Sequence, residues 1–162
     1  MEHTGGILSA IEQSWLGVLA RESVWLYPAA NVGHILALTI LAASVAIMDA
    51  RLLGAFRDIP PGRFLRGVRW IAVCGVAAMV LTGSVLFAAE ATHVAVNPVF
   101  QTKLVLIGLA LLNALLFELL AARHVRALPE RVEMPFLARA NAALSLGLWF
   151  CVAATGRLIA YF

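Results

Sequence analysis

The sequence predicts an all-α integral membrane protein whose four spanning helices form an up-down bundle. Of its 162 residues, 62% are hydrophobic and only 13% are charged, and the mean hydropathy is +0.92. A soluble domain of this size has too little core to hide so much apolar surface. The hydrophobic residues form long blocks, each near the roughly 20 helical residues that cross a bilayer core. Short loops join the blocks, so consecutive spans are expected to run antiparallel.

Residues 1–24 are expected to form an amphipathic helix at the membrane interface, outside the spanning domain. Within 7–20, one helical face gathers the large apolar residues, and the stretch is too short and too polar to span. The basic region and cleavage site of a signal peptide are missing, so none is expected. The residues of the apolar face are Ile7, Leu8, Ile11, Trp15, Val18 and Leu19.

Residues 25–162 are expected to form one domain with spans at about 25–48, 70–89, 99–122 and 140–162. Trp25 and Tyr27 supply an interfacial aromatic belt at the start of the first span, and Asn97-Pro98 introduces the third. Cys74 and Cys151 lie in the second and fourth spans without the spacing of a metal or redox motif. Both are expected to be small buried packing residues.

The charges of the loops predict the orientation. The first and third loops are rich in arginine, whereas the second carries only Glu90, His93 and Lys103. By the positive-inside rule the arginine-rich loops face the cytoplasm, which places both termini on the periplasmic side of a bacterial inner membrane. Membrane orientation also explains the net charge of +3, so no nucleic-acid partner is expected. The arginines are Arg51, Arg57, Arg63, Arg66 and Arg69 in the first loop and Arg123, Arg126, Arg131 and Arg139 in the third.

Ionisable groups inside spans are costly, so they are candidates for function. His34 is the only histidine within a span, and it lies in the outer half of the first. An imidazole there can ligate a metal or haem iron, carry protons, or hydrogen-bond to a neighbouring helix. Lys103 opens the third span and Arg157 lies near the outer end of the fourth. Each can also extend to lipid headgroups.

The outer ends of all four spans therefore supply His34, Glu90 or His93, Lys103 and Arg157. This set suits a b-type haem, with His34 on the iron and Lys103 and Arg157 paired with the propionates. The sixth position is either His93, if the outer loop folds back, or empty. A quinone headgroup or a lipid phosphate would suit the same residues.

Polar residues nearer the inner side have structural interpretations. Asp49, beside Arg51, is expected to be a solvated or ion-paired helix cap. Glu118 is expected to pair with an arginine of a neighbouring helix. Asn113, near the middle of the third span, is expected to form an interhelical hydrogen bond.

The order of these residues resembles a group of short bacterial four-helix membrane proteins that includes HemJ-like protoporphyrinogen oxidases and CopD-like copper-resistance domains. The matching stretches are Asn31-Val32-Gly33-His34, Leu81-Thr82-Gly83 and Phe100-Gln101-Thr102-Lys103-Leu104. The stretches 49–54 and 156–161 look typical of an uncharacterised bacterial branch. The resemblance implies a haem b associated with His34 and a role for Lys103 in activity.

Four functions follow from these observations. The leading one is a small haem b protein for membrane electron transfer, alone or within a redox complex. The second is a non-enzymatic accessory subunit that packs against other membrane subunits or further copies of itself. The third is a porphyrin or quinone oxidoreductase, so the sequence leaves open whether the chain is an enzyme. A copper transporter is the fourth, although methionine clusters are missing.

Overall fold

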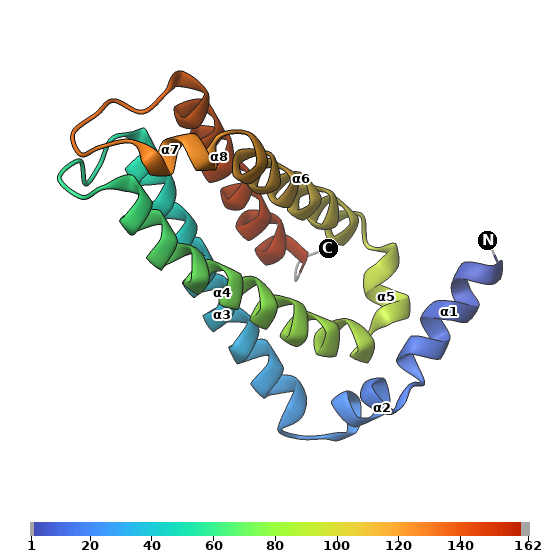
Figure 1. Cartoon of the computed structure of the whole chain (residues 1–162). Coiled ribbons are helices and arrows are strands. Elements are labelled where there is room, and N and C mark those ends of the chain that lie inside the picture. Colours follow the sequence, from blue (N-terminus) through green and yellow to red (C-terminus); the bar gives the residue numbers. More distant parts are fainter. Residues whose placement is uncertain (1, 160–162) are drawn as a thin grey trace.

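The computed structural model describes residues 2–159, with side chains from residue 6 onward, and it is all-α (Figure 1). Within this range there are four long helices and four short ones, and residues 160–162 of the expected fourth span lie outside it. The helices are α1 (Glu2–Glu12), α2 (Trp15–Glu22), α3 (Leu26–Leu53), α4 (Pro61–Ala89), α5 (Ala91–Val96), α6 (Pro98–Leu120), α7 (Ala122–Ala127) and α8 (Phe136–Leu158).

The four long helices α3, α4, α6 and α8 are each long and apolar enough to cross a membrane. Three of them extend beyond the expected spans at the arginine-rich ends: α3 continues to Leu53, α4 begins at Pro61 and α8 begins at Phe136. Helix α3 ends at Gly54, whose φ of 112° lies in the left-handed region that favours glycine. The arginines of the first loop were therefore misplaced, because most of them belong to helix ends and only Arg57 lies in the connection.

The long helices pack in the order α4, α3, α8, α6. Helix α3 contacts both α4 and α8, and α6 packs against α8. The α3–α4 connection and the α7–α8 segment lie at one end of the molecule, whereas α1, α2 and α5 lie at the other (Figure 1). We call the first the arginine-rich end and the second the His34 end.

The most extensive helix packing is between α3 and α4. Leu41, Val45 and Ala72 form a buried cluster there. Gly75 faces Leu41 so closely that a Cβ on the glycine would lie 3.1 Å from the Cβ of Leu41. A second cluster at the arginine-rich end joins α3, α4, α7 and α8 through Leu52, Leu65, Val125, Met134, Ala138 and Ala142.

Helices α4 and α6 touch near both of their ends. At the arginine-rich end, Arg69 Nη1 lies 2.9 Å from Glu118 Oε1. At the His34 end the rings of Phe87 and Phe100 stack with centroids 5.7 Å apart. From Arg69 to Phe87 on α4 there are as many residues as from Phe100 to Glu118 on α6. The residue numbers rise in opposite directions between the two contacts, so the helices are antiparallel and in register. At the helical rise this separation is roughly 27 Å, close to the thickness of a bilayer core.

Helices α6 and α8 are joined by two asparagines, as expected for Asn113. Its Nδ2 donates to the carbonyl of Asn141 over 3.3 Å. Asn141 Nδ2 donates back to the carbonyl and to Oδ1 of Asn113, over 3.2 and 2.7 Å. The pair satisfies both side-chain amides between two otherwise apolar helix faces.

The N-terminal region forms two helices, so the prediction of one amphipathic helix over 7–20 was wrong. The break comes at Ser14, whose hydroxyl accepts a hydrogen bond from the backbone N–H of Gly17 and thereby caps α2. Gly17 and Ala20 are buried, with Gly17 against the end of α4. Ile7 and Trp15, by contrast, stay largely exposed.

Glu12 at the end of α1 ties this region to α5. Its Oε2 accepts hydrogen bonds from the hydroxyl and the backbone N–H of Thr92, over 2.6 and 3.0 Å. These bonds from Thr92 hold the pKa of Glu12 below its ordinary value, against the effect of burial, and the charge of Arg21 lowers it further. Arg21 also donates to the carbonyl of Ala89 over 3.0 Å.

Cys74 and Cys151 are exposed, so the prediction that they are buried was wrong. Ala72 and Gly75 occupy the face of α4 that meets α3, and Cys74 points elsewhere. In helices that are apolar on all sides, hydropathy does not reveal which face is buried.

We expect the Asn113–Asn141 pair to be coupled energetically. Asn113→Ala, Asn141→Ala and the double variant form a cycle whose coupling free energy we expect to be about 0.6 kcal/mol and at most about 1.7 kcal/mol. The measurement is equilibrium unfolding in detergent micelles. Ser84→Ala is the control, because that hydroxyl bonds only to Val80 in its own helix. Strictly additive effects of the two asparagine substitutions would contradict the coupling.

Candidate functional site

His34 lies on α3 at the His34 end and faces α4. Its imidazole is half-buried, and its Nδ1 lies 2.9 Å from the hydroxyl oxygen of Thr82. That hydroxyl lies 2.7 Å from the carbonyl oxygen of Ala78, one turn earlier on α4, and donates its single hydrogen there. With the hydroxyl hydrogen on this carbonyl, Thr82 accepts the hydrogen bond and Nδ1 of His34 carries the proton; in the other tautomer the hydroxyl donates to Nδ1 instead.

The protonation of Nδ1 leaves Nε2 of His34 as the unprotonated nitrogen of the neutral ring. Within the described part of the chain, Nε2 makes no hydrogen bond. A neutral imidazole with Nδ1–H anchored to a protein oxygen is the usual state of a metal-ligating histidine, since the second hydrogen bond fixes both tautomer and ring orientation. In the tautomer with its proton on Nδ1, His34 has the electronic form of a ligand.

Two glycines allow this approach of α3 to α4. A Cβ on Gly83 would lie 3.2 Å from Cε1 of His34, and a Cβ on Gly33 would lie 3.2 Å from the Cγ2 of Thr82. Both distances are tighter than ordinary side-chain contacts. Gly33, His34, Thr82 and Gly83 thus form one packed unit, and they belong to two of the stretches that the sequence singles out.

Lys103 reaches the same level of the molecule from α6. Its side chain is half-buried and lies over Gly156 of α8, where a Cβ would be 3.4 Å from Nζ. The ammonium group interacts electrostatically with the imidazole of His34. Lys103 thus joins α6 to α8 at Gly156, and its electrostatic effect on His34 relates this contact to the contact between α3 and α4.

The other two expected site residues are placed differently. Arg157 follows Gly156 in the last turn of α8 and is exposed. His93 lies on α5, is exposed, and forms no hydrogen bond with His34 in the part of the chain that the structure describes. Of the expected set, the structure thus relates Lys103 to His34 through electrostatics.

Near the arginine-rich end, Glu118 behaves as expected and pairs with arginines. It contacts Arg69 of α4 and, through its second oxygen, Arg126 of α7. One carboxylate is thus shared by two guanidinium groups from two other helices.

Asp49 and Arg51 form neither a solvated nor an ion-paired cap, so that prediction was wrong. Asp49 is 6% exposed, interacts with the hydroxyl of Ser145, and has an Oδ2 without a hydrogen-bond partner among the described residues. Arg51 is fully buried and donates to the carbonyl of Ile59 through Nε and Nη2, over 3.3 and 3.0 Å. Residues two apart on a helix do not face each other, which keeps this pair separate.

Thr82 is the site residue whose role sequence reasoning missed. Its regular spacing from Cys74 and Ala78 indicated packing only. The available signal was its position directly before Gly83, in a stretch matched by the family resemblance. A hydroxyl beside a glycine in an apolar helix can meet a polar side chain of a neighbouring helix at close range.

A metal site built from protein ligands alone is not found. Among residues 6–159, whose side chains the structure describes, no three or more His, Cys, Asp and Glu side chains gather in a way that could hold an ion. The candidate site therefore offers a single nitrogen ligand with cations nearby.

No curated protein and no solved structure is significantly similar to this chain. One family model matches residues 7–162, and its description is a family of unknown function, DUF6644. Since the match includes nearly all of the chain, the protein belongs to the DUF6644 family.

Proposed function

We propose that this protein binds a b-type haem in the bacterial inner membrane and takes part in electron transfer, alone or as a subunit of a redox complex. The observation that carries the proposal is the state of His34. The hydroxyl of Thr82 lies within hydrogen-bond distance of both Nδ1 of His34 and the carbonyl oxygen of Ala78, and the proposal assigns the ring proton to Nδ1 and the lone pair to Nε2. The other expected functions do not need this arrangement.

The residues at the site fit a haem with one protein ligand. Nε2 of His34 would take the iron, and Thr82 would position the ring. Lys103 and Arg157 are the cations expected to pair with the two propionates. A bound haem would supply one-electron redox chemistry. The protein would supply the ligand, its orientation and a largely apolar surrounding, which tune the potential.

Insertion as a four-helix bundle in the membrane is part of the proposal. The roughly 27 Å between the two α4–α6 contacts matches a bilayer core. The arginine-rich connections lie together at one end, which favours the cytoplasmic side for that end. Both termini then lie on the periplasmic side, with α1 and α2 at the interface.

A second candidate is an accessory subunit of a larger membrane assembly or of a homo-oligomer. It is favoured by α6, in which only 11% of the most apolar window is buried within the chain. Lipid covers such a face equally well, so this candidate leads only if no haem binds.

We expect the detergent-purified protein to show a Soret band and, after dithionite reduction, sharp α and β bands. His34→Ala removes the iron ligand and should abolish these bands. Thr82→Val removes the hydroxyl that positions the ring and should weaken haem binding about tenfold to a hundredfold. Thr82→Ser keeps the hydroxyl and should restore it. His93→Ala is the matched control and should bind haem normally.

Two results would contradict this proposal. One is a featureless visible spectrum after expression with added haem precursor, in which case the accessory-subunit candidate leads. The other is full haem content in His34→Ala, which would remove the assignment of the ligand.

We expect labelling of single cysteines to follow the proposed orientation. In a Cys74→Ser, Cys151→Ser background, Glu22→Cys marks α2 and Ala127→Cys marks α7; both positions are exposed. With a membrane-impermeant maleimide on intact spheroplasts, Glu22→Cys should react at once. Ala127→Cys should react only after permeabilisation, and the reverse pattern would refute the orientation.

A further inference from the structure

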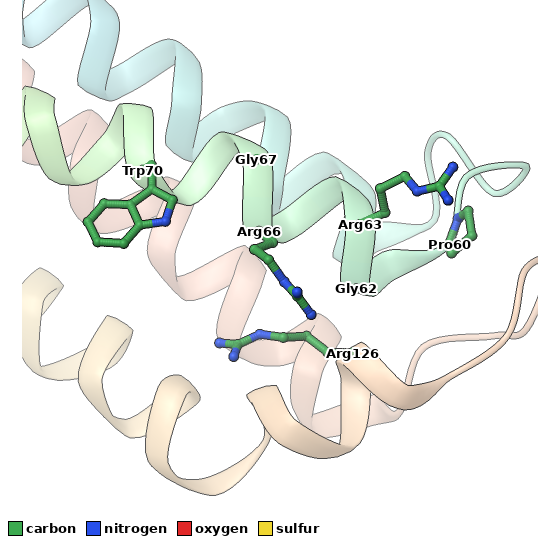
Figure 2. A pocket seen from close by; sticks show the side chains of 7 residues that line it. All are labelled: Pro60, Gly62, Arg63, Arg66, Gly67, Trp70 and Arg126. Atoms are coloured by element: carbon green, nitrogen blue, oxygen red, sulfur yellow. The ribbon is translucent and has the colours of Figure 1, made fainter.

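A groove of about 590 Å³ lies at the arginine-rich end, between the first turns of α4 and helix α7 (Figure 2). Two glycines shape it. At Gly62, an added Cβ would collide with the carbonyl oxygen of Arg126, so α4 and α7 are in direct contact there. At Gly67, an added Cβ would meet nothing within 4 Å, so this position is open. The lining residues are Pro60, Gly62, Arg63, Arg66, Gly67, Trp70 and Arg126.

The charge of the groove is positive and incompletely balanced. Figure 2 shows Arg66 extending from α4 towards the stem of Arg126 on α7, whereas the guanidinium group of Arg126 points past it and Arg63 turns away from both. Arg126 shares its carboxylate partner, Glu118, with Arg69. Among the described residues, neither Arg63 nor Arg66 has an ion pair. Arg63 and Arg66 therefore leave positive charge at the groove without a carboxylate partner among the described residues, and a phosphate accepts hydrogen bonds from guanidinium groups.

The start of α4 adds donors to the same groove. Pro60 precedes the helix and Pro61 occupies its first turn, and no side chain caps the free N–H groups there. Because the N-terminus of a long helix carries partial positive charge and unpaired N–H groups, it favours an anion.

The position of Trp70 indicates what kind of molecule carries the phosphate. Arg63, Arg66 and Trp70 follow one another at three- and four-residue spacing, so they share a face of α4. Trp70 is 68% exposed and lies further along α4, towards the apolar part of the helix. Along a spanning helix, arginines lie at the level of the lipid headgroups and tryptophan lies deeper, at the boundary with the hydrocarbon core. Arg63, Arg66 and Trp70 follow this order.

We propose that this groove binds the headgroup phosphate of an anionic phospholipid. The phosphate lies between Arg66 and Arg126, Arg63 adds a further charge, and the acyl chains run along Trp70 and the apolar face of α4. The inference rests on the proposed membrane insertion. It does not depend on haem, whose expected site is at the opposite end of the molecule.

The test is native mass spectrometry of the detergent-purified protein titrated with phosphatidylglycerol and, separately, with phosphatidylcholine. We expect phosphatidylglycerol to bind more tightly. Arg63→Gln and Arg66→Gln should each weaken its binding about fivefold. Arg139→Gln is the control, because this exposed arginine lies at the same end but outside the groove, and it should leave the affinity unchanged.

A second variant separates loss of binding from loss of folding. Gly67→Leu fills the open position without changing the charge, and glycine inside a helix is unfavourable relative to leucine. This variant should keep or raise thermal stability while it weakens phosphatidylglycerol binding.

Equal affinities for the two lipids, or equal effects of Arg66→Gln and Arg139→Gln, would overturn the proposal. Inorganic phosphate provides the remaining arm of the experiment. If it binds the lipid-free protein and displaces phosphatidylglycerol, the groove is a site for free phosphate and the lipid assignment is wrong. A failure to bind haem leaves every one of these outcomes unchanged.

Discussion

The close contact between α3 and α4 determines the position of His34 and of its hydrogen-bond partner Thr82. Gly33, Gly75 and Gly83 remove the side chains that would otherwise hold the two helices apart. Once the helices are in contact, the imidazole of His34 has one oxygen within reach, that of Thr82. A polar ring inside an apolar helix pair is stable only with such a partner, because burial without one costs about 1–3 kcal/mol. The glycines let α3 and α4 approach each other closely. This short distance between the helices allows the hydrogen bond between His34 and Thr82 to form.

The remaining helices set the level at which that histidine meets a charge. Register between α4 and α6 is held by the Arg69–Glu118 pair at one end and by the stacked Phe87 and Phe100 rings at the other. This register brings Lys103 to the height of Gly83, and Gly156 gives its side chain room against α8. One end of the molecule thus holds a ligand nitrogen beside a cation, and the other holds arginines that outnumber their carboxylate partners.

The sequence predicted the parts of this arrangement that depend on composition and on rare residues. Four apolar blocks gave four long helices, and the few polar residues inside them, such as His34, Asn113 and Glu118, could be named as candidates because each is costly in that setting. Glu118 and Asn113 were also assigned correct kinds of partner.

What the sequence could not predict depends on which face of each helix is buried. Helices that are apolar on all sides give no signal for that face, so Cys74 was placed inside and the role of Thr82 was missed. Asp49 and Arg51 were read as a helix end because charge normally ends a span, whereas packing against α8 and the carbonyl of Ile59 keep both inside the fold. The groove at the arginine-rich end joins α4 to α7, and no local pattern links those segments.

The central claim is that His34 is held as the tautomer with its proton on Nδ1. The most direct test is nitrogen-15 solid-state NMR of the haem-free protein in bilayers, in a variant that retains His34 as its only histidine. The pH should be about 8, above the ordinary imidazole pKa of about 6.5. The account predicts a protonated Nδ1 and an unprotonated Nε2, and a shift of this balance in Thr82→Val. A proton on Nε2, with Nδ1 accepting from Thr82, would contradict it, because the nitrogen assigned to the iron would then have no lone pair to offer.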